Sequence, residues 1–328
     1  MKNKKGWSLW GVLALLAGVA IYSACTGSIK VSGLELLKGL IDGENKQVEV
    51  IRDLRFPRII VSMLVGAALA VSGVLLQAVM RSSLADAGVI GISSGAGFVS
   101  ILIVSLFPNW FFWMPLISCI GGGLACLLVF SFAWKSGLHP IRILLVGIAV
   151  NATFSGLGQS FNYRGSYAVT SINQAVTSIF TMKNWGDVRI MLIYGSIGLL
   201  LALLVSPWCN LLALQDKSAK NAGLHVHRAR FIISGIAVLL AAVATAVGGL
   251  IVFVGLLVPH IARLLVGSDH RILIPFSALG GALLILTADT IGRTVLAPAE
   301  IPASIIMAVI GGPFLIFMLR RSDRIHGH

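Results

Sequence analysis

The feature that most constrains this chain is a series of long apolar stretches that recurs from one end to the other. Most are about 18 to 25 residues long, and a helix of that length crosses the roughly 30 Å hydrocarbon core of a bilayer. Backbone polar groups find no water in that core, so each stretch must satisfy them internally as a helix. The sequence therefore predicts an all-α, polytopic membrane protein.

Ten candidate spans can be counted, the eighth of them short. They cover residues 7–26, 58–79, 88–107, 112–134, 141–161, 190–209, 231–250, 255–267, 272–293 and 303–320. An even number places both termini on one side of the membrane. Of the 25 Lys and Arg residues, 15 fall on that side and 10 on the other, and cytoplasmic loops carry the excess of positive charge. We therefore expect both termini in the cytoplasm and one transmembrane domain over residues 1–328.

Composition excludes several classes of protein. The chain is 57% hydrophobic and only 11% of its residues are charged, less than half of the roughly 25% found in soluble domains. A water-soluble enzyme of this length is therefore excluded. A net charge of +13 is also common in proteins that bind nucleic acid, but here the Lys and Arg residues stand singly or in short groups between the apolar stretches, as in membrane proteins. The four cysteines lie in or beside apolar stretches without a C-x-x-C pair. We expect no nucleic-acid partner, no metal site and no cofactor.

Catalytic motifs are absent or misplaced. No G-x-x-x-x-G-K-[ST] motif occurs, so any ATP-driven step requires a separate ATPase chain. Gly91–Gly95 matches the G-x-S-x-G nucleophile elbow, but that turn joins a strand to a helix and here it opens a membrane helix. We expect Gly91 and Gly95 to serve helix packing. The pairs His225/His227 and His326/His328 are weak metal signals and are expected to be solvated.

Residues 27–57 form a polar outer segment that carries charges of both signs and should meet a charged partner. It ends in Arg55-Phe56-Pro57-Arg58, and Pro57 suits the first turn of a helix, where its missing N–H costs nothing. Both arginines would then lie at the outer surface. They either snorkel to lipid headgroups or accept carboxylates from an external partner, because Arg pairs carboxylates in bidentate fashion.

Three further features carry charge. Residues 211–230 form the longest inner loop, read as a short amphipathic helix closed by Gly223 and followed by a second short turn, which suits a docking surface. Asp289 and Arg293 are spaced i, i+4 near the outer end of the ninth span and can form a structural pair. Asp86 is interpreted as a helix N-cap on the inner side. Residues 162–189 form a long outer connection expected to contain a short interfacial helix.

These motifs, taken in order, resemble the FecCD-type permeases of ABC importers for cobalamin and iron siderophores. Arg55–Arg58 is similar to their R-L-P-R signature, and Leu84–Gly88 with Gly91–Ala96 is similar to their P-L-A-D-P-G-x-L-G-x-S-S-G-A run. The strongest likeness is C-terminal. It comprises Phe253–Arg263 with Pro259 and His260, Gly267–Arg271, Ala288-Asp289, Ala297–Pro302 and Gly311–Phe314.

The resemblance implies a non-catalytic permease subunit of the bacterial cytoplasmic membrane. It would pair with a second permease subunit, a copy or more often a paralogue, above two ATP-binding cassette subunits and below an extracytoplasmic substrate-binding protein. Arg55, Arg58 and Arg293 would receive acidic residues of that binding protein. The cargo implied is a ferric siderophore moved by alternating access, with cobalamin or heme as alternatives.

The resemblance also assigns ATPase coupling to the inner loop. The residues of this chain to which it assigns coupling are Gln215, Asp216, Lys217, Ala219, Gly223 and Leu224. The family pattern G-D-E-x-A-x-x-L-G is altered at Gln215, Lys217 and Ala222, and the reversed charge at Lys217 implies an adapted ATPase groove. Residues 162–189 match the family least, so substrate or partner choice is expected there.

Two rival classes remain open from the residues alone. An ion-coupled secondary transporter would need an unpaired carboxylate or a broken helix near mid-membrane, and apart from Asp289 and Asp86 the spans offer few. A membrane-embedded hydrolase is suggested only by the misplaced motif at Gly91–Gly95.

Overall fold

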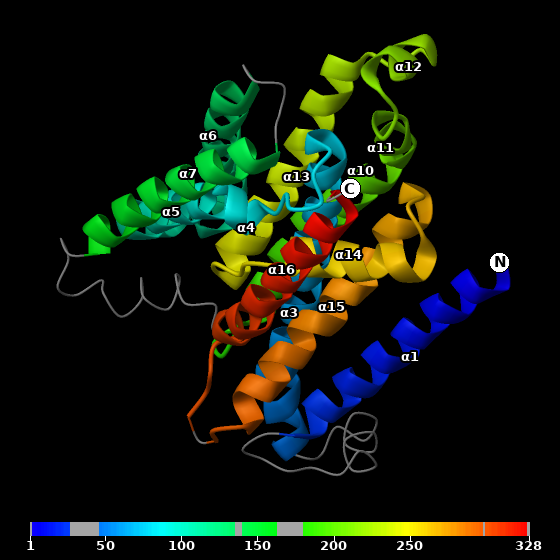
Figure 1. Cartoon of the computed structure of the whole chain (residues 1–328). Helices are drawn as coiled ribbons and strands as arrows, with labels where there is room; N and C mark the ends of the chain where they lie inside the picture. The colour runs from blue at the N-terminus through cyan, green and yellow to red at the C-terminus, as the bar shows by residue number, and fades with distance from the viewer. Residues whose placement is uncertain (1, 27–45, 135–139, 163–179, 298, 327–328) are drawn as a thin grey trace.

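The computed structural model describes residues 2–26, 46–134, 140–162, 180–297 and 299–326, and all regular structure in these ranges is helical (Figure 1). The helices in chain order are α1 (Lys2–Cys25), α3 (Lys46–Met80), α4 (Ala87–Ile90), α5 (Ile92–Leu106), α6 (Met114–Trp134), α7 (Pro140–Asn162), α9 (Trp185–Ile190), α10 (Ser196–Leu204), α11 (Ser206–Leu212), α12 (Asp216–Asn221), α13 (Val226–Gly248), α14 (Val254–Val266), α15 (His270–Thr294) and α16 (Ala303–His326). A 3-10 turn, η1 (Pro108–Trp113), precedes α6, and a π-helical turn, η2 (Met191–Gly195), precedes α10.

Each of the ten predicted spans coincides with helical structure, which confirms the all-α prediction. Six described helical segments are long and apolar enough to cross a membrane. The third span is divided into α4 and α5 at Gly91, whose φ of 91° is left-handed, a conformation that glycine adopts without steric cost. The sixth span runs through α9, η2, α10 and α11, and begins five residues earlier than predicted, at Trp185.

The centre of the bundle is α3, which packs against α13, α14 and α15. Glycines permit the closest approaches. A Cβ atom at Gly66 or Gly281 would clash with the backbone carbonyl of the other residue, and a Cβ atom at Gly73 would clash with the carbonyl of Gly255. Small residues at helix crossings are the usual means of close packing in lipid, where helix association depends on van der Waals contact.

The start of α3 differs from the prediction. The helix begins at Lys46, so Pro57 lies inside it and not in its first turn. Proline in a helix interior removes one backbone hydrogen bond, but the residues from Lys46 to Phe56 favour helix and continue it outward. Of the polar outer segment 27–57, residues 27–45 lie outside the described ranges and the remainder belongs to α3.

The two ends of the bundle are formed by different elements. In Figure 1 the short helix α12 marks the upper end, and the C-terminal ends of α1 and α15 lie at the lower end with the start of α3. The positive-inside count assigns the α12 end to the cytoplasm. Residues 163–179 of the long outer connection lie outside the described ranges; its described end leads into α9, the start of the sixth span, which is capped reciprocally by Asn184 and Asp187.

Candidate functional site

The outer end of the bundle contains a buried ionic cluster centred on Arg58. The Arg58 guanidinium donates to both carboxylate oxygens of Asp289, with Nε 2.9 Å from Oδ2 and Nη2 2.8 Å from Oδ1. Its Nη1 donates to Glu300 at 3.0 Å. One side chain of α3 is therefore bound to α15 and to the connection between α15 and α16, and the planar fork of arginine suits this double pairing.

Glu300 completes the cluster toward the outer surface. The Thr181 hydroxyl donates to its Oε2 at 2.6 Å. Burial would raise the pKa of Glu300, but the hydrogen bond from Thr181 and the positive charge of Arg58 outweigh it and hold that pKa below its ordinary value. The carboxylate is thus held in its charged form, and it links the segment before α9 to the centre of the outer face.

The other two predicted arginines hold the end of α1. Arg293 donates through Nη2 to the backbone carbonyl of Ser23 at 2.9 Å and to its hydroxyl at 2.6 Å. Arg55 donates to the carbonyl of Ala24 at 2.9 Å. The last carbonyls of a helix have no intrahelical partner, so the two arginines satisfy groups that would otherwise be unpaired in an apolar region.

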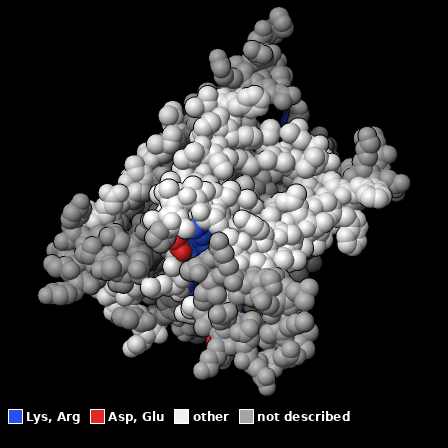
Figure 2. Space-filling model, turned by 90° about the horizontal axis from the view of Figure 1, so that it is seen from below, with Lys and Arg blue, Asp and Glu red and all other residues white. Residues whose placement is uncertain are grey.

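The structure therefore brings Arg55, Arg58 and Arg293 together at the outer face and gives each an acceptor within the chain. Their exposed fractions are only 9%, 7% and 9%. Asp289 and Arg293 do pair, at 3.7 Å, although Arg58 is the closer partner of Asp289. Seen from this side, basic and acidic atoms lie next to one another among described atoms of uncharged residues (Figure 2). Contact between these arginines and a binding protein stays a prediction.

At the cytoplasmic end, α12 has the closure that the sequence predicts. Gly223 has a left-handed φ of 83°, its N–H donates to the carbonyl of Lys220, and the N–H of Leu224 donates to the carbonyl of Ala219. These two bonds form a Schellman motif, which satisfies carbonyls at a helix end. The predicted second short turn is instead the start of α13, because the chain re-enters a helix at Val226.

The predicted coupling residues divide into two groups. Ala219 is fully buried and Leu224 nearly so, and they form the apolar contact that accompanies a Schellman motif. Gln215 and Lys217 are exposed and are available to a partner. Four of the six predicted positions thus form a buried pair and an exposed pair; of the other two, Gly223 closes α12 and Asp216 anchors it.

Asp216 anchors α12 to two long helices. Its carboxylate lies 2.7 Å from the guanidinium of Arg81, which follows α3, and 3.1 Å from that of Arg230 in α13. Arg81 also donates to the backbone carbonyls of Leu212 and Leu214. Arg81 and Arg230 were not predicted as site residues; the signal for each in the sequence is a basic residue at the cytoplasmic end of a span.

A second link that the sequence analysis missed joins α11 to α15. Asn210 donates through its side-chain amide to Asp269, the N-cap of α15, at 2.8 Å, and its side-chain oxygen accepts from the backbone N–H of His270 at 2.9 Å. The inner loop is therefore fixed to the bundle on both sides of α12.

Asp86 is the N-cap of α4, as predicted, since it accepts from the N–H of Gly88. It also accepts from the N–H of Phe253 at 3.3 Å, so one carboxylate joins the starts of α4 and α14. The side chain is 3% exposed and α4 lies midway along the bundle in Figure 1. Asp86 follows Arg81, at the inner end of α3, by five residues and lies within the bundle; its position on the inner side of the membrane stays a prediction.

The remaining motif residues serve packing. Gly95 lies against Gly121 of α6, where a Cβ atom on either residue would meet the other's carbonyl, and Ser93 is fully buried, which agrees with the packing interpretation. Pro259 is buried inside α14, and the ring of His260 lies edge-on to Phe314 of α16 at 5.7 Å. In the described ranges no group of His, Cys, Asp or Glu could hold a metal ion, and the four cysteines are free thiols.

Comparison with known proteins agrees with this architecture. Residues 15–321 match the FecCD transport family. A Staphylococcus aureus protein named "Probable heme-iron transport system permease protein IsdF" is 40% identical over 324 residues, 99% of this chain and 98% of the relative. A solved structure of a metal-chelate type ABC transporter in an inward-facing conformation matches with a TM-score of 0.80 at 29% identity, covering 96% of this chain and 99% of the other. PsaBC from Streptococcus pneumoniae shares the fold, with a TM-score of 0.60 at 16% identity over 87% of this chain and 94% of the other.

Proposed function

Because this chain belongs to the FecCD transport family, we propose that it is the permease subunit that carries an iron-bearing chelate inward in an ATP-driven importer. The observation that carries the proposal is the family match over residues 15–321, in a chain whose ten predicted spans are all helical. Two such subunits, as copies or paralogues, would enclose the path, with two ATPase chains at the α12 end and a substrate-binding protein at the outer end.

The cargo proposed first is heme-iron, since the relative at 40% identity is named for heme-iron transport. A ferric siderophore, the cargo expected from the family resemblance, and cobalamin are the alternatives. The test is uptake of labelled heme, ferric siderophore and cobalamin by cells that lack this chain, with and without its re-expression. Restored heme uptake supports the first assignment, and restored siderophore or cobalamin uptake alone replaces it. No restoration of any of the three would overturn the proposal.

At the outer end, we propose that the arginine cluster shapes and charges the surface on which the binding protein docks. Reversing the charge of Arg58 would break a buried ion pair and confound folding with docking. Arg55→Gln is the sharper variant, because it removes the charge and keeps a polar, hydrogen-bonding side chain near the Ala24 carbonyl. Arg52, whose side chain is 54% exposed, provides the matched control Arg52→Gln.

The measurement is the affinity of the binding protein for the purified permease in nanodiscs, together with the melting temperature of each variant. We expect Arg55→Gln to weaken binding by about tenfold, the loss of roughly one charge-assisted hydrogen bond, without lowering the melting temperature. Unchanged affinity, or the same loss in Arg52→Gln, would remove Arg55 from the docking surface.

At the cytoplasmic end, we propose that α12 receives the movement of the ATPase chains and passes it to α3 and α13 through Asp216. Asp216→Asn keeps the shape of the side chain but weakens both ion pairs. We expect it to reduce uptake while the assembled ATPases still hydrolyse ATP. Asp53→Asn, in an exposed pair with Arg52, is the control; an equal effect there, or normal uptake in Asp216→Asn, would contradict the coupling role.

A further inference from the structure

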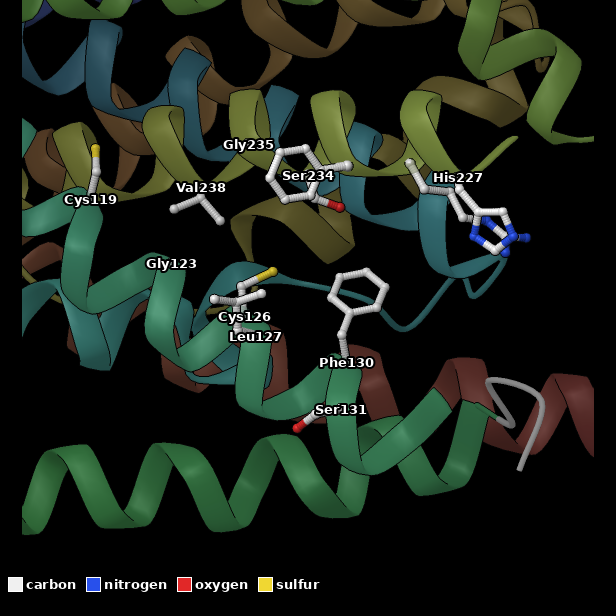
Figure 3. A pocket seen from close by; sticks show the side chains of 12 residues that line it. Cys119, Gly123, Cys126, Leu127, Phe130, Ser131, His227, Ser234, Gly235 and Val238 are labelled. Carbon is white, nitrogen blue, oxygen red and sulfur yellow. The ribbon is translucent and has the colours of Figure 1, made fainter. Parts of the chain in front are cut away.

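A groove of about 620 Å³ lies between α6 and the cytoplasmic half of α13 (Figure 3). Its volume lies within the roughly 300–1,000 Å³ typical of small-molecule sites. The α6 wall consists of Cys119, Gly123, Cys126, Leu127, Phe130 and Ser131. The α13 wall consists of His227, Arg230, Phe231, Ser234, Gly235 and Val238. The groove contains no residue of the outer arginine cluster, and it shares only Arg230 with the contacts of Asp216 that anchor α12.

The α13 wall of the groove runs from Val238, near the middle of α13, to His227 at its cytoplasmic start. From His227 to Val238 the α13 wall advances by about 16 Å, at 1.5 Å per residue. One leaflet contributes about half of the roughly 30 Å hydrocarbon core. The groove therefore matches the depth of a single leaflet, and it lies in the cytoplasmic one because α13 begins at that surface.

The chemistry changes along the groove. Most of its length is lined by aliphatic, aromatic and thiol side chains, whereas the cytoplasmic end carries His227 and Arg230. Arg230 is 9% exposed. One of its terminal nitrogens pairs with Asp216, but its Nε has no hydrogen-bond acceptor within the described residues. A buried donor of this kind calls for an acceptor, and phosphate oxygens, like carboxylate oxygens, form strong charge-assisted hydrogen bonds with arginine.

We propose that this groove binds an acyl chain of an anionic phospholipid from the cytoplasmic leaflet, with the phosphate next to Arg230. The apolar walls take the chain and the cationic end takes the headgroup. The side chains that flank the opening fit this environment, since Leu127 is 61% and Phe231 is 76% exposed at a depth where the surrounding medium is hydrocarbon.

A phospholipid bound in the groove would affect transport, because Arg230 also forms an ion pair with Asp216 of α12. A phosphate that engages Nε would hold the guanidinium in place from the groove side while Asp216 holds it from the loop side. The lipid would thus become part of the anchor between α12 and α13. This consequence rests on the proposed coupling role, whereas lipid binding itself does not.

Two glycines make the groove testable. Gly123 and Gly235 line opposite walls, and a Cβ atom at either would meet no heavy atom within 4 Å. Leucine at both positions should fill the groove with little disturbance of neighbouring side chains. Gly18 and Gly156 also have open space around them but lie elsewhere, in α1 and α7, so Gly18→Leu with Gly156→Leu is the matched control.

The experiment uses the full-length chain in nanodiscs that contain phosphatidylglycerol with a photoreactive group in its acyl chain. After illumination, labelled peptides are mapped by mass spectrometry. We expect labels within residues 119–131 and 227–238, loss of most of that labelling in the double variant Gly123→Leu/Gly235→Leu, and none of that loss in the control. Equal labelling in the filled and control variants would overturn the proposal.

Headgroup selectivity is tested separately with competing phosphatidylglycerol and phosphatidylcholine. Arg230→Gln should reduce the preference for phosphatidylglycerol by about tenfold, and Arg228→Gln, an exposed neighbour outside the groove, should not. A preference unchanged by Arg230→Gln would overturn the headgroup assignment. If a photoreactive residue at position 127 crosslinks to a second protein chain instead of lipid, the groove is a protein interface and the proposal fails.

Discussion

A guanidinium buried in an apolar region is tolerated only when its charge is paired and its donors are occupied. Arg58 meets this condition through two carboxylates, one of them 231 positions away in the chain. Those partners became visible only in the folded structure, since nothing local to Arg55–Arg58 indicates which distant acid it will meet. The sequence motif correctly indicated the outer position of the arginines but not their burial.

Removing one partner of this cluster should be costly. We expect Arg58→Ala to destabilise the fold by about 3–5 kcal/mol, because it leaves the Asp289 carboxylate buried without its counter-ion. Arg58→Lys should recover only part of the loss, since an ammonium cannot form the planar bidentate pair. Thermal unfolding of the purified chain in detergent measures both; a lysine variant as stable as the wild type would show that charge alone is sufficient.

Glu300 gives the cluster a defined dependence on pH. Its pKa is lowered in the folded chain, so its contribution to stability is present above the ordinary glutamate pKa of about 4.3 and is lost as pH falls through the lower folded value. We expect the wild type to be more stable than Glu300→Gln at neutral pH and the two to converge under strong acid. Melting curves between pH 7 and pH 3 provide the measurement, and a constant gap would contradict the assignment.

At the scale of elements, the spans were predictable because a membrane imposes the length of a helix before any tertiary contact is considered. The interior position of Pro57 in α3 was not predictable in this way. A proline indicates the first turn of a helix unless the residues before it also favour helix. The return of the chain into the bundle at Asp86 was not predictable either. The carboxylate that caps α4 also accepts a hydrogen bond from the N–H of Phe253, which is far along the sequence.

The crossing of α3 and α15 depends on Gly66 and Gly281. We expect Gly281→Ala to destabilise the bundle by about 1–3 kcal/mol, because the new methyl group would collide with the Gly66 carbonyl and force the helices apart. Gly312→Ala, where the added Cβ atom meets nothing within 4 Å, is the control. Equal melting temperatures for the two variants would mean that the crossing can relax at no cost.

The end of α12 depends on the backbone of Gly223. An L-residue in the left-handed region costs about 1–2 kcal/mol, and open space around this glycine makes the effect one of backbone alone. We therefore expect Gly223→Ala to loosen α12 and to speed amide hydrogen exchange in residues 216–224. Gly223→Asn should be milder, because asparagine tolerates that conformation better; identical exchange in both variants would contradict the role of the cap.

At the scale of the whole molecule, the sequence was sufficient for the topology, the outer arginines and the inner loop, all of which follow from hydropathy, charge bias and local motifs. It was insufficient for the links that hold these parts together. Arg81 and Arg230 meet Asp216 only because the ends of α3 and α13 converge, and the groove between α6 and α13 exists only because those helices diverge toward the cytoplasm.

The continuous helix α3 has a consequence for energetics across the membrane. It has 35 residues and is therefore about 52 Å long, with Arg58 bound near the outer face and Arg81 bound just beyond its inner end. Thermodynamic linkage requires that a ligand at one face which changes affinity at the other is itself affected by the same factor. We predict that bound ATPase chains and a docked binding protein alter each other's dissociation constants equally. Arg58→Lys and Asp216→Asn should both bring that common factor toward one. The common factor is measured by titration in nanodiscs. If neither substitution changes it, the two faces communicate by another route.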